Sequence, residues 1–182
     1  MTSGVERELS AALPDVAREV EEFVGGAGWD QPPQLFALVR TAELVAAEPA
    51  VGDRVDRSSV LTPVAQEPLP DGELDLTLAG ITWPAAVAGC AAAVQVVVLP
   101  PGAEAELDSR VAAAGEPADL VSRLAAEHPE HREARLVAAV LRGGAGACVL
   151  RLRGDADTAD ELVERPDLAP NLLDALRATL EP

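Results

Sequence analysis

The chain has 182 residues, which favours a single domain over residues 1–182, able to bury roughly 70% of its unfolded-chain surface. Apolar residues make up 48% of the chain, which excludes an intrinsically disordered protein. The formal net charge of −17 disfavours contact with nucleic-acid phosphates and with anionic lipid. All 14 basic residues are Arg, as expected where a GC-rich genome biases codon choice.

No segment indicates export or membrane insertion. The first 22 residues are rich in Glu, unlike a signal peptide. The longest apolar run, 85–99, is interrupted by Gly89 and Gln95 and is too short to span a membrane. We therefore expect a cytoplasmic protein, in which Cys90 and Cys148 are buried thiols rather than a disulfide.

The first predicted element is an amphipathic helix over residues 5–24. Its apolar residues recur in steps of three and four, and they are Val5, Leu9, Leu13, Val16, Val20, Phe23 and Val24. Pro14 predicts either a kink or a fresh helix start. Residues 34–40 are then predicted to form a strand, and residues 41–47 a short helix capped by Thr41.

The middle of the chain alternates weaker and stronger patterns. Residues 60–67 predict an edge strand, because Pro63 cannot donate a hydrogen bond to a neighbouring strand. Residues 74–81 predict a short helix or an irregular cover. Residues 86–99 are apolar on both faces, which indicates a central strand, and a helix is expected over 117–128.

The clearest pattern is a β-hairpin formed by residues 135–142 and 147–153 around a Gly-rich turn at 143–146. Placing Arg142 opposite Ala147 gives the hairpin one wholly apolar face. Side chains alternate with a period of two, so a slip of one residue in either arm would turn arginines toward the core. The pattern thus predicts both a register and an inner face.

Five residues make up the predicted interaction surface. Arg142, Arg151 and Arg153 lie on the second face of the hairpin and cluster positive charge on an acidic chain. They either keep the sheet soluble and protect its edge, or they bind an anion. Trp29 and Trp83 each lie beside a Pro-containing turn, where they either plug the ends of the sheet or anchor an interface.

The chain is predicted to end in an acidic loop over 154–164 and a helix that begins near Pro170. The order of elements favours an α+β fold rather than a doubly wound sheet. We expect an antiparallel sheet of four to five strands with helices packed mainly on one face. The order loosely resembles that of the small secretion chaperones.

No catalytic, cofactor or metal set is predicted. His128 and His131 have a spacing that can share a metal on a helix, but the proline between them favours a solvated helix end. The acidic run 155–161 lacks the Gly and the distant Glu of a calcium loop, so an acidic helix start is expected. Burial should raise the thiol pKa of Cys90 and Cys148, which disfavours a nucleophile. The sequence contains no Ser elbow, Walker loop or dinucleotide-binding Gly motif.

Several segments carry a resemblance to a known family. They are WDQPPQLFALV (29–39), TAEL (41–44), LTPVAQEPLP (61–70), WPAAVAGC (83–90), VLPP (98–101), HREAR (131–135) and PDLAP (166–170). With these segments the chain resembles an uncharacterised family of small acidic actinobacterial proteins that is labelled only by a locus tag. The resemblance covers most of the chain and implies a cytoplasmic actinobacterial origin. It brings no activity, cofactor or catalytic residue.

We therefore expect a non-enzymatic binding or adaptor protein, whose partner is a second copy or another protein. Neither nucleic acid nor membrane is expected as a partner, and no cofactor is expected. The alternative is an enzyme of unknown class, acting on a small molecule in a pocket built from Arg residues and carboxylates.

Overall fold

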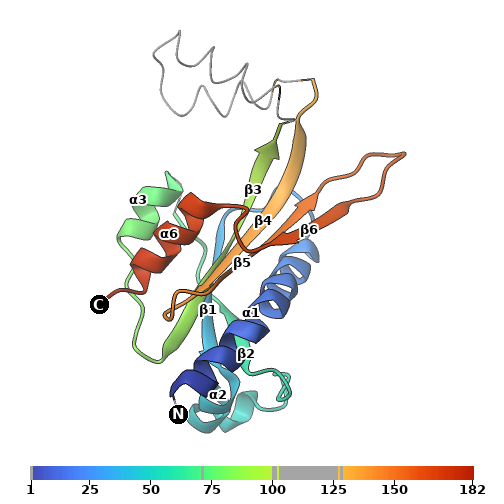
Figure 1. Ribbon diagram of the computed structural model, residues 1–182. Coiled ribbons are helices and arrows are strands. Elements are labelled where there is room, and N and C mark those ends of the chain that lie inside the picture. Colours follow the sequence, from blue (N-terminus) through green and yellow to red (C-terminus); the bar gives the residue numbers. More distant parts are fainter. Residues whose placement is uncertain (1, 71, 100–101, 103–126, 128) are drawn as a thin grey trace.

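A computed structural model describes residues 2–70, 72–99, 102, 127 and 129–182, and it has an α+β fold built on one antiparallel sheet (Figure 1). The helices are α1 (Thr2–Gly25), α2 (Thr41–Ala47), α3 (Leu74–Ala79) and α6 (Pro170–Thr179), with a 3₁₀ turn η1 (Pro49–Val51). The strands are β1 (Gln34–Arg40), β2 (Leu61–Ala65), β3 (Val87–Val98), β4 (Arg132–Leu141), β5 (Gly146–Leu152) and β6 (Glu161–Arg165). They lie in the order β2-β1-β3-β4-β5-β6. The helix predicted over 117–128 lies outside the described residues.

The sheet has six strands, so the prediction of four to five is too low. The additional strand is β6, which occupies the end of the predicted acidic loop over 154–164. Its five residues, Glu-Leu-Val-Glu-Arg, are all exposed except the half-buried Val163, because β6 has a neighbour on one side only among the described strands. An edge strand of this kind lacks the apolar pattern that marks the inner strands. The strands predicted at 34–40, 60–67 and 86–99 all form.

Helices cover both faces of the sheet, so the prediction of helices mainly on one face is wrong (Figure 1). Alternate residues of each strand point to opposite faces. The face under α1 buries Phe36, Leu38, Ala91, Ala93, Val137, Ala139 and Val149. The face under α3 and α6 buries Leu35, Ala37, Cys90, Ala92, Ala138, Val140 and Cys148. The inner strands are therefore apolar on both faces, because each face belongs to a core.

The β4–β5 hairpin forms, but its register differs from the predicted one by three residues. Ala139 pairs with Ala147 instead of with Leu150. The turn is also shorter than predicted: the N–H of Gly144 donates to the carbonyl of Leu141, and Gly144 has a φ of +96°. This is the geometry of a three-residue turn with glycine in the left-handed region. The predicted register is chosen so that one face of the hairpin is wholly apolar. Because both faces are buried in the structure, the position of the apolar residues does not determine the register.

Helix α1 runs without interruption from Thr2 to Gly25, although Pro14 lies inside it. Five residues of the predicted stripe are buried, and they are Leu9, Leu13, Val16, Val20 and Val24. The other two are exposed, Val5 at 43% and Phe23 at 63%. The Phe23 ring still meets Phe36 edge-on, with 5.9 Å between ring centroids. The buried stripe sets the face of α1 that meets the sheet.

Candidate functional site

The five predicted site residues do not form one surface. Arg151 and Arg153 lie on the α1 face of the sheet, where they meet Glu21 and Trp29. Trp83 and Arg142 lie together at the end of α6, on the opposite face. The structure thus yields two clusters, each with one tryptophan.

The cluster on the α1 face is centred on Glu21, whose side chain is 0% exposed. Its Oε1 accepts hydrogen bonds from Arg135 Nη1 at 2.8 Å and from Arg151 Nε at 2.7 Å. Its Oε2 accepts a further bond from Arg151 Nη2 at 2.8 Å. Burial by itself would raise the pKa of the Glu21 carboxyl, but the hydrogen bonds and charges of Arg151 and Arg135 outweigh it and lower this pKa. The carboxylate therefore stays ionised and holds two guanidinium groups on the inner face of the sheet.

Trp29 closes this cluster from the loop that follows α1. Its ring lies 4.6 Å from the guanidinium carbon of Arg135 and 5.3 Å from that of Arg153, within reach of a cation–π attraction. Arg135 also donates to the carbonyl of Gly28 at 2.9 Å, and Arg153 pairs with Glu133 at 2.5 Å. The cations of the cluster are thus engaged by the chain itself, which ties the α1–β1 loop to β4 and β5.

Glu21 and Arg135 are not among the predicted site residues, although both are almost fully buried. A signal for Glu21 does exist in the sequence. It lies four residues after Ala17 and three before Val24, both of which are buried, and so falls on the apolar face of the helix. Arg135 likewise stands at the start of an apolar strand pattern. A carboxylate and an arginine placed on buried faces of two elements indicate an ion pair, but not which partner each takes.

Arg142 binds backbone carbonyls at the other cluster. Its Nε donates to Val87 at 2.7 Å, its Nη2 to Trp83 at 3.1 Å and to Pro84 at 2.9 Å, and its Nη1 to Leu180. The guanidinium thereby joins the end of α6 to the segment that enters β3. This role in holding the fold differs from the anion-binding face that the sequence allowed.

The half-buried Trp83 also contacts Thr179. The indole Nε1 donates to Thr179 Oγ1 at 2.9 Å, and Cys90 Sγ lies 3.6 Å from the same oxygen. Burial raises the pKa of the Cys90 thiol to about 11, and burial also raises the pKa of Cys148. Both cysteines are buried and unpaired, as predicted. Thiols with raised pKa values are protonated at neutral pH and are weak nucleophiles.

A groove of about 520 Å³ lies between the first turns of α1, the entry to β3 and the β4–β5 turn. We call it the charged groove. Its charged side chains are Glu6, Arg7, Arg40, Glu43 and Arg142, and Ser3 and Ser10 add hydroxyl groups. Three arginines and two glutamates line the groove, an excess of one positive charge on a chain whose net charge is −17, although the Arg142 guanidinium is bound to backbone carbonyls.

A second groove of about 440 Å³ flanks the same turns of α1 and faces α2 and the segment that enters β2. Its surface is mostly apolar, so we call it the apolar groove. Its apolar side chains are Val5, Leu9, Ala42, Val45 and Val60. Leu9 and Arg40 line both grooves. The two grooves therefore adjoin, with the first turns of α1 between them.

Metal ligation and membrane insertion find no support in the described parts of the chain. No group of three His, Cys, Asp or Glu residues there could hold a metal ion, and His128, the predicted neighbour of His131, lies outside them. The acidic run 155–161 forms a loop that leads into β6, so the expected helix start is wrong. Asp155 bends this loop by accepting from the Asp157 N–H at 2.9 Å. No described helix combines the length and apolar character needed to cross a bilayer.

The geometry defines a small α+β protein with an open, six-stranded antiparallel sheet, helices on both faces and two adjoining grooves beside its first helix. The chain belongs to the PPA1309-like protein family, which it matches over residues 13–181. This match confirms the resemblance to a locus-tag family found in the sequence. The matched range begins inside α1, so the first turns that line both grooves lie before it. No curated protein and no solved structure matches the chain.

Proposed function

We propose that this protein is a non-enzymatic binding protein, or adaptor, that holds a short segment of another protein in the charged and apolar grooves. The two grooves adjoin and differ in character, which supports this proposal. A peptide can place an acidic side chain near Arg7 and Arg40 and an aliphatic side chain near Val45. Peptide recognition commonly combines such charged and apolar contacts.

The state of the other reactive side chains supports the same role. Both thiols have raised pKa values, and Arg142 is occupied by carbonyls of its own chain. Arg135 and Arg151 are likewise held by Glu21. These groups stabilise the fold. The order of the elements loosely resembles that of the small secretion chaperones. By analogy with them, we include a chaperone-like role in the cytoplasm in this proposal.

Arg40 gives the sharpest test, because it lines both grooves and, within the described residues, pairs only with the exposed Glu43. Peptides would be selected from a displayed library on the immobilised full chain and measured by calorimetry. Arg40→Glu should weaken binding about tenfold or more, since it reverses a charge at the junction of the grooves. Arg54→Glu makes the same change at an exposed residue outside both grooves and should leave binding unchanged. A library that yields no peptide, or peptides indifferent to Arg40→Glu, would contradict the proposal.

The alternative is an enzyme that acts on a small molecule, and the composition of the charged groove is the observation that favours it. Ser10, Glu6 and Arg7 bring a hydroxyl, a carboxylate and a guanidinium to one hollow. A screen of small molecules by NMR would separate the two functions. A compound that binds the charged groove and is chemically converted would favour the enzyme, whereas unreactive peptides spanning both grooves would favour the adaptor.

A further inference from the structure

The two edges of the sheet differ in their free backbone groups. At the β2 edge, the N–H of Gln66 donates to Leu35 and the N–H of Thr41 donates to Val60, so even-numbered residues of β2 bond to β1. Bonding direction alternates along an antiparallel strand, and the odd-numbered residues therefore face outward. Pro63 is one of them and has no N–H. The β2 edge is thereby protected against another strand.

The β6 edge keeps its donors. The N–H of Arg153 donates to the carbonyl of Glu133, so odd-numbered residues of β5 bond to β4 and even-numbered ones bond to β6. Their partners in β6 are the odd-numbered residues. The N–H and C=O groups of Leu162 and Glu164 consequently point away from the sheet. Among the described residues, no strand pairs with this side of β6.

We propose that β6 pairs, antiparallel, with β6 of a second copy of this chain about a two-fold axis at Val163. In this register Leu162 lies opposite Glu164 of the second copy. The outward N–H and C=O groups of these two residues then bond to each other on both sides of the axis. Glu161 lies opposite Arg165 of the second copy, and Arg165 opposite its Glu161. Both ends of the strand pair thus carry opposite charges, as a two-fold interface requires of a self-complementary surface.

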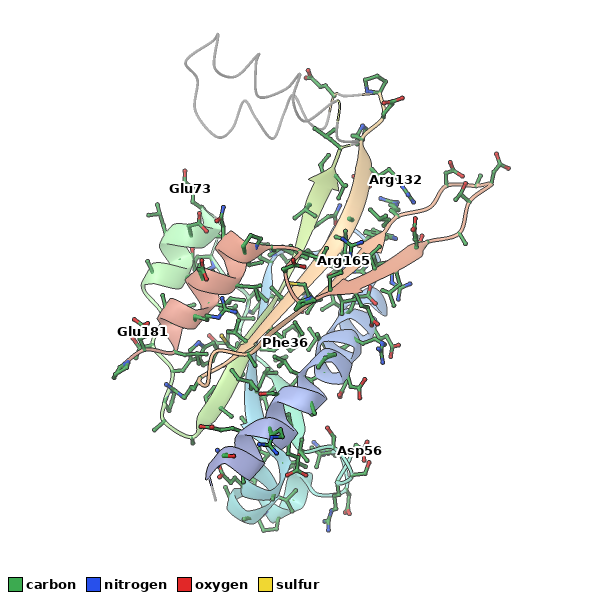
Figure 2. All side chains as sticks on the ribbon, in the orientation of Figure 1. Phe36, Asp56, Glu73, Arg132, Arg165 and Glu181 are labelled. Carbon is green, nitrogen blue, oxygen red and sulfur yellow. The ribbon has the colours of Figure 1, made fainter. Side chains whose placement is uncertain are left out.

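Two other two-fold registers, with axes one residue away, would also let the outward N–H and C=O groups of the two copies bond. Both are disfavoured because they place like charges opposite each other. An axis at Glu164 would place two Glu164 side chains directly opposite each other. An axis at Leu162 would place Glu164 opposite Asp160. Like charges directly opposite destabilise a strand pair. Arg165, labelled in Figure 2, is the last residue of β6. Pro166 follows it and has no N–H, so it ends the ladder.

Side chains around β6 leave the second copy room to approach. Glu164 is turned toward α1, where Arg18 binds both of its oxygens at 2.7 and 3.0 Å. Leu162 is 39% exposed, one of the few large apolar side chains at the described surface. The loop that joins β5 to β6 also extends beyond the helices that cover the sheet (Figure 1). A second copy can therefore reach this end of the β6 edge without meeting a helical layer first.

The dimer should be weak and dependent on concentration. A strand pair of this length buries less than the roughly 1,000 Å² of a stable interface, and each chain carries a net charge of −17. At about 0.15 M salt the Debye length is about 8 Å, so repulsion between whole chains is screened while charges facing across a strand pair still interact. No β6 residue lines either groove. Dimer formation and peptide binding can therefore succeed or fail separately.

Sedimentation and NMR of the full chain test the contact directly. At concentrations up to about 1 mM, the chain should show a reversible monomer–dimer equilibrium. The amide signals of Leu162 and Glu164 should shift with concentration. The amide of Ala65, on the outward side of the protected β2 edge, serves as the control and should not shift. A chain that stays monomeric over this range, or shifts confined to other residues, would overturn the proposal.

A charge exchange tests the register. Arg165→Glu and Glu161→Arg each place like charges at both ends of the strand pair, so each should weaken the dimer about tenfold or more. A mixture of the two variants has opposite charges at both ends and should form a heterodimer, although neither associates with itself. The double variant should dimerise like the original chain. Circular dichroism would verify that each variant is folded, and a dimer unaffected by either single change would exclude this register.

Discussion

Replacement of Glu21 by Gln should destabilise the fold far more than a single lost hydrogen bond would. Gln preserves the shape and one acceptor oxygen but removes the negative charge that holds Arg135 and Arg151. The Arg135 side chain is 6% exposed and that of Arg151 is 26% exposed. Removing one partner of a buried ion pair costs about 3–5 kcal/mol, because the remaining charge is left in a poorly hydrated site. We expect about 3 kcal/mol, since Arg151 still reaches water.

Urea denaturation followed by circular dichroism would measure this loss. In a domain of this size 1 kcal/mol corresponds to about 2–4 °C, so the melting temperature should fall by about 6–12 °C. Glu22→Gln removes the same charge from the exposed neighbouring residue and should change the free energy of unfolding by no more than about 0.5 kcal/mol. A loss below about 1 kcal/mol for Glu21→Gln would refute the reasoning, because it would mean that both guanidinium groups are already well hydrated.

The pH dependence supplies an independent check on the charge of Glu21. Its carboxyl pKa is lowered in the folded protein, so its folded pKa lies below the unfolded value of about 4.3. The stability that this shift contributes is fully present above the unfolded pKa and is lost as the pH falls through the folded pKa. The original chain should therefore lose its advantage over Glu21→Gln below about pH 4. Parallel stability curves across that window would show that Glu21 is not the titrating group.

Three further predictions concern the backbone and the thiols. Gly144→Ala should lower the free energy of unfolding by about 1 kcal/mol or more, because Gly144 has a φ of +96°. Gly143→Ala is the control and should leave this free energy nearly unchanged, since no atom lies within 4 Å of an added Cβ. Urea denaturation measures both. Cys90 and Cys148 should react with Ellman's reagent at about pH 8 no faster than the protein unfolds, and rapid labelling of the native chain would contradict their burial. Pro14→Ala should raise the free energy of unfolding by about 1–3 kcal/mol by restoring a helical hydrogen bond, and a drop in melting temperature would show that α1 needs the proline's geometry.

Local signals in the sequence are sufficient to place most elements of the fold. The strand over 34–40 and the helix over 41–47 agree with the structure at both ends. The predicted cap by Thr41 is wrong, because Arg40 occupies the cap position without a side-chain bond and the Thr41 hydroxyl bonds to that of Thr62 at 2.8 Å instead. Pro63 marks an edge strand for a reason that needs no tertiary context, since a missing N–H restricts it to an outward position. Strand β6 is missed because three of its five residues are charged, so no alternation of apolar and polar residues marks it as a strand. It forms because β5 offers it a strand edge to pair with.

The hairpin register depends on information that the local sequence does not hold. Arg151 and Arg153 look like solvent-facing residues, and that interpretation turns them away from the core. In the structure Arg151 faces the core under α1, because Glu21, 130 residues earlier, neutralises it there. A buried charge is tolerated only with its partner, so its placement is decided by the tertiary fold. The shift of three residues in register, an odd number, then places Arg142 and Arg151 on opposite sides of the sheet, although sequence spacing assigned them to one face.

The distribution of arginine partners determines which cations remain available to a ligand or a second copy. The chain has 31 acidic and 14 basic residues, and within its described part seven arginines form ion pairs with carboxylates. Arg135, Arg151 and Arg153 are held in ion pairs. Within the described residues, by contrast, Arg7 and Arg165 form no ion pair. One of these lines the charged groove and the other ends β6, where a partner could supply a carboxylate. Arg54, Arg57 and Arg142 also form no ion pair within the described residues.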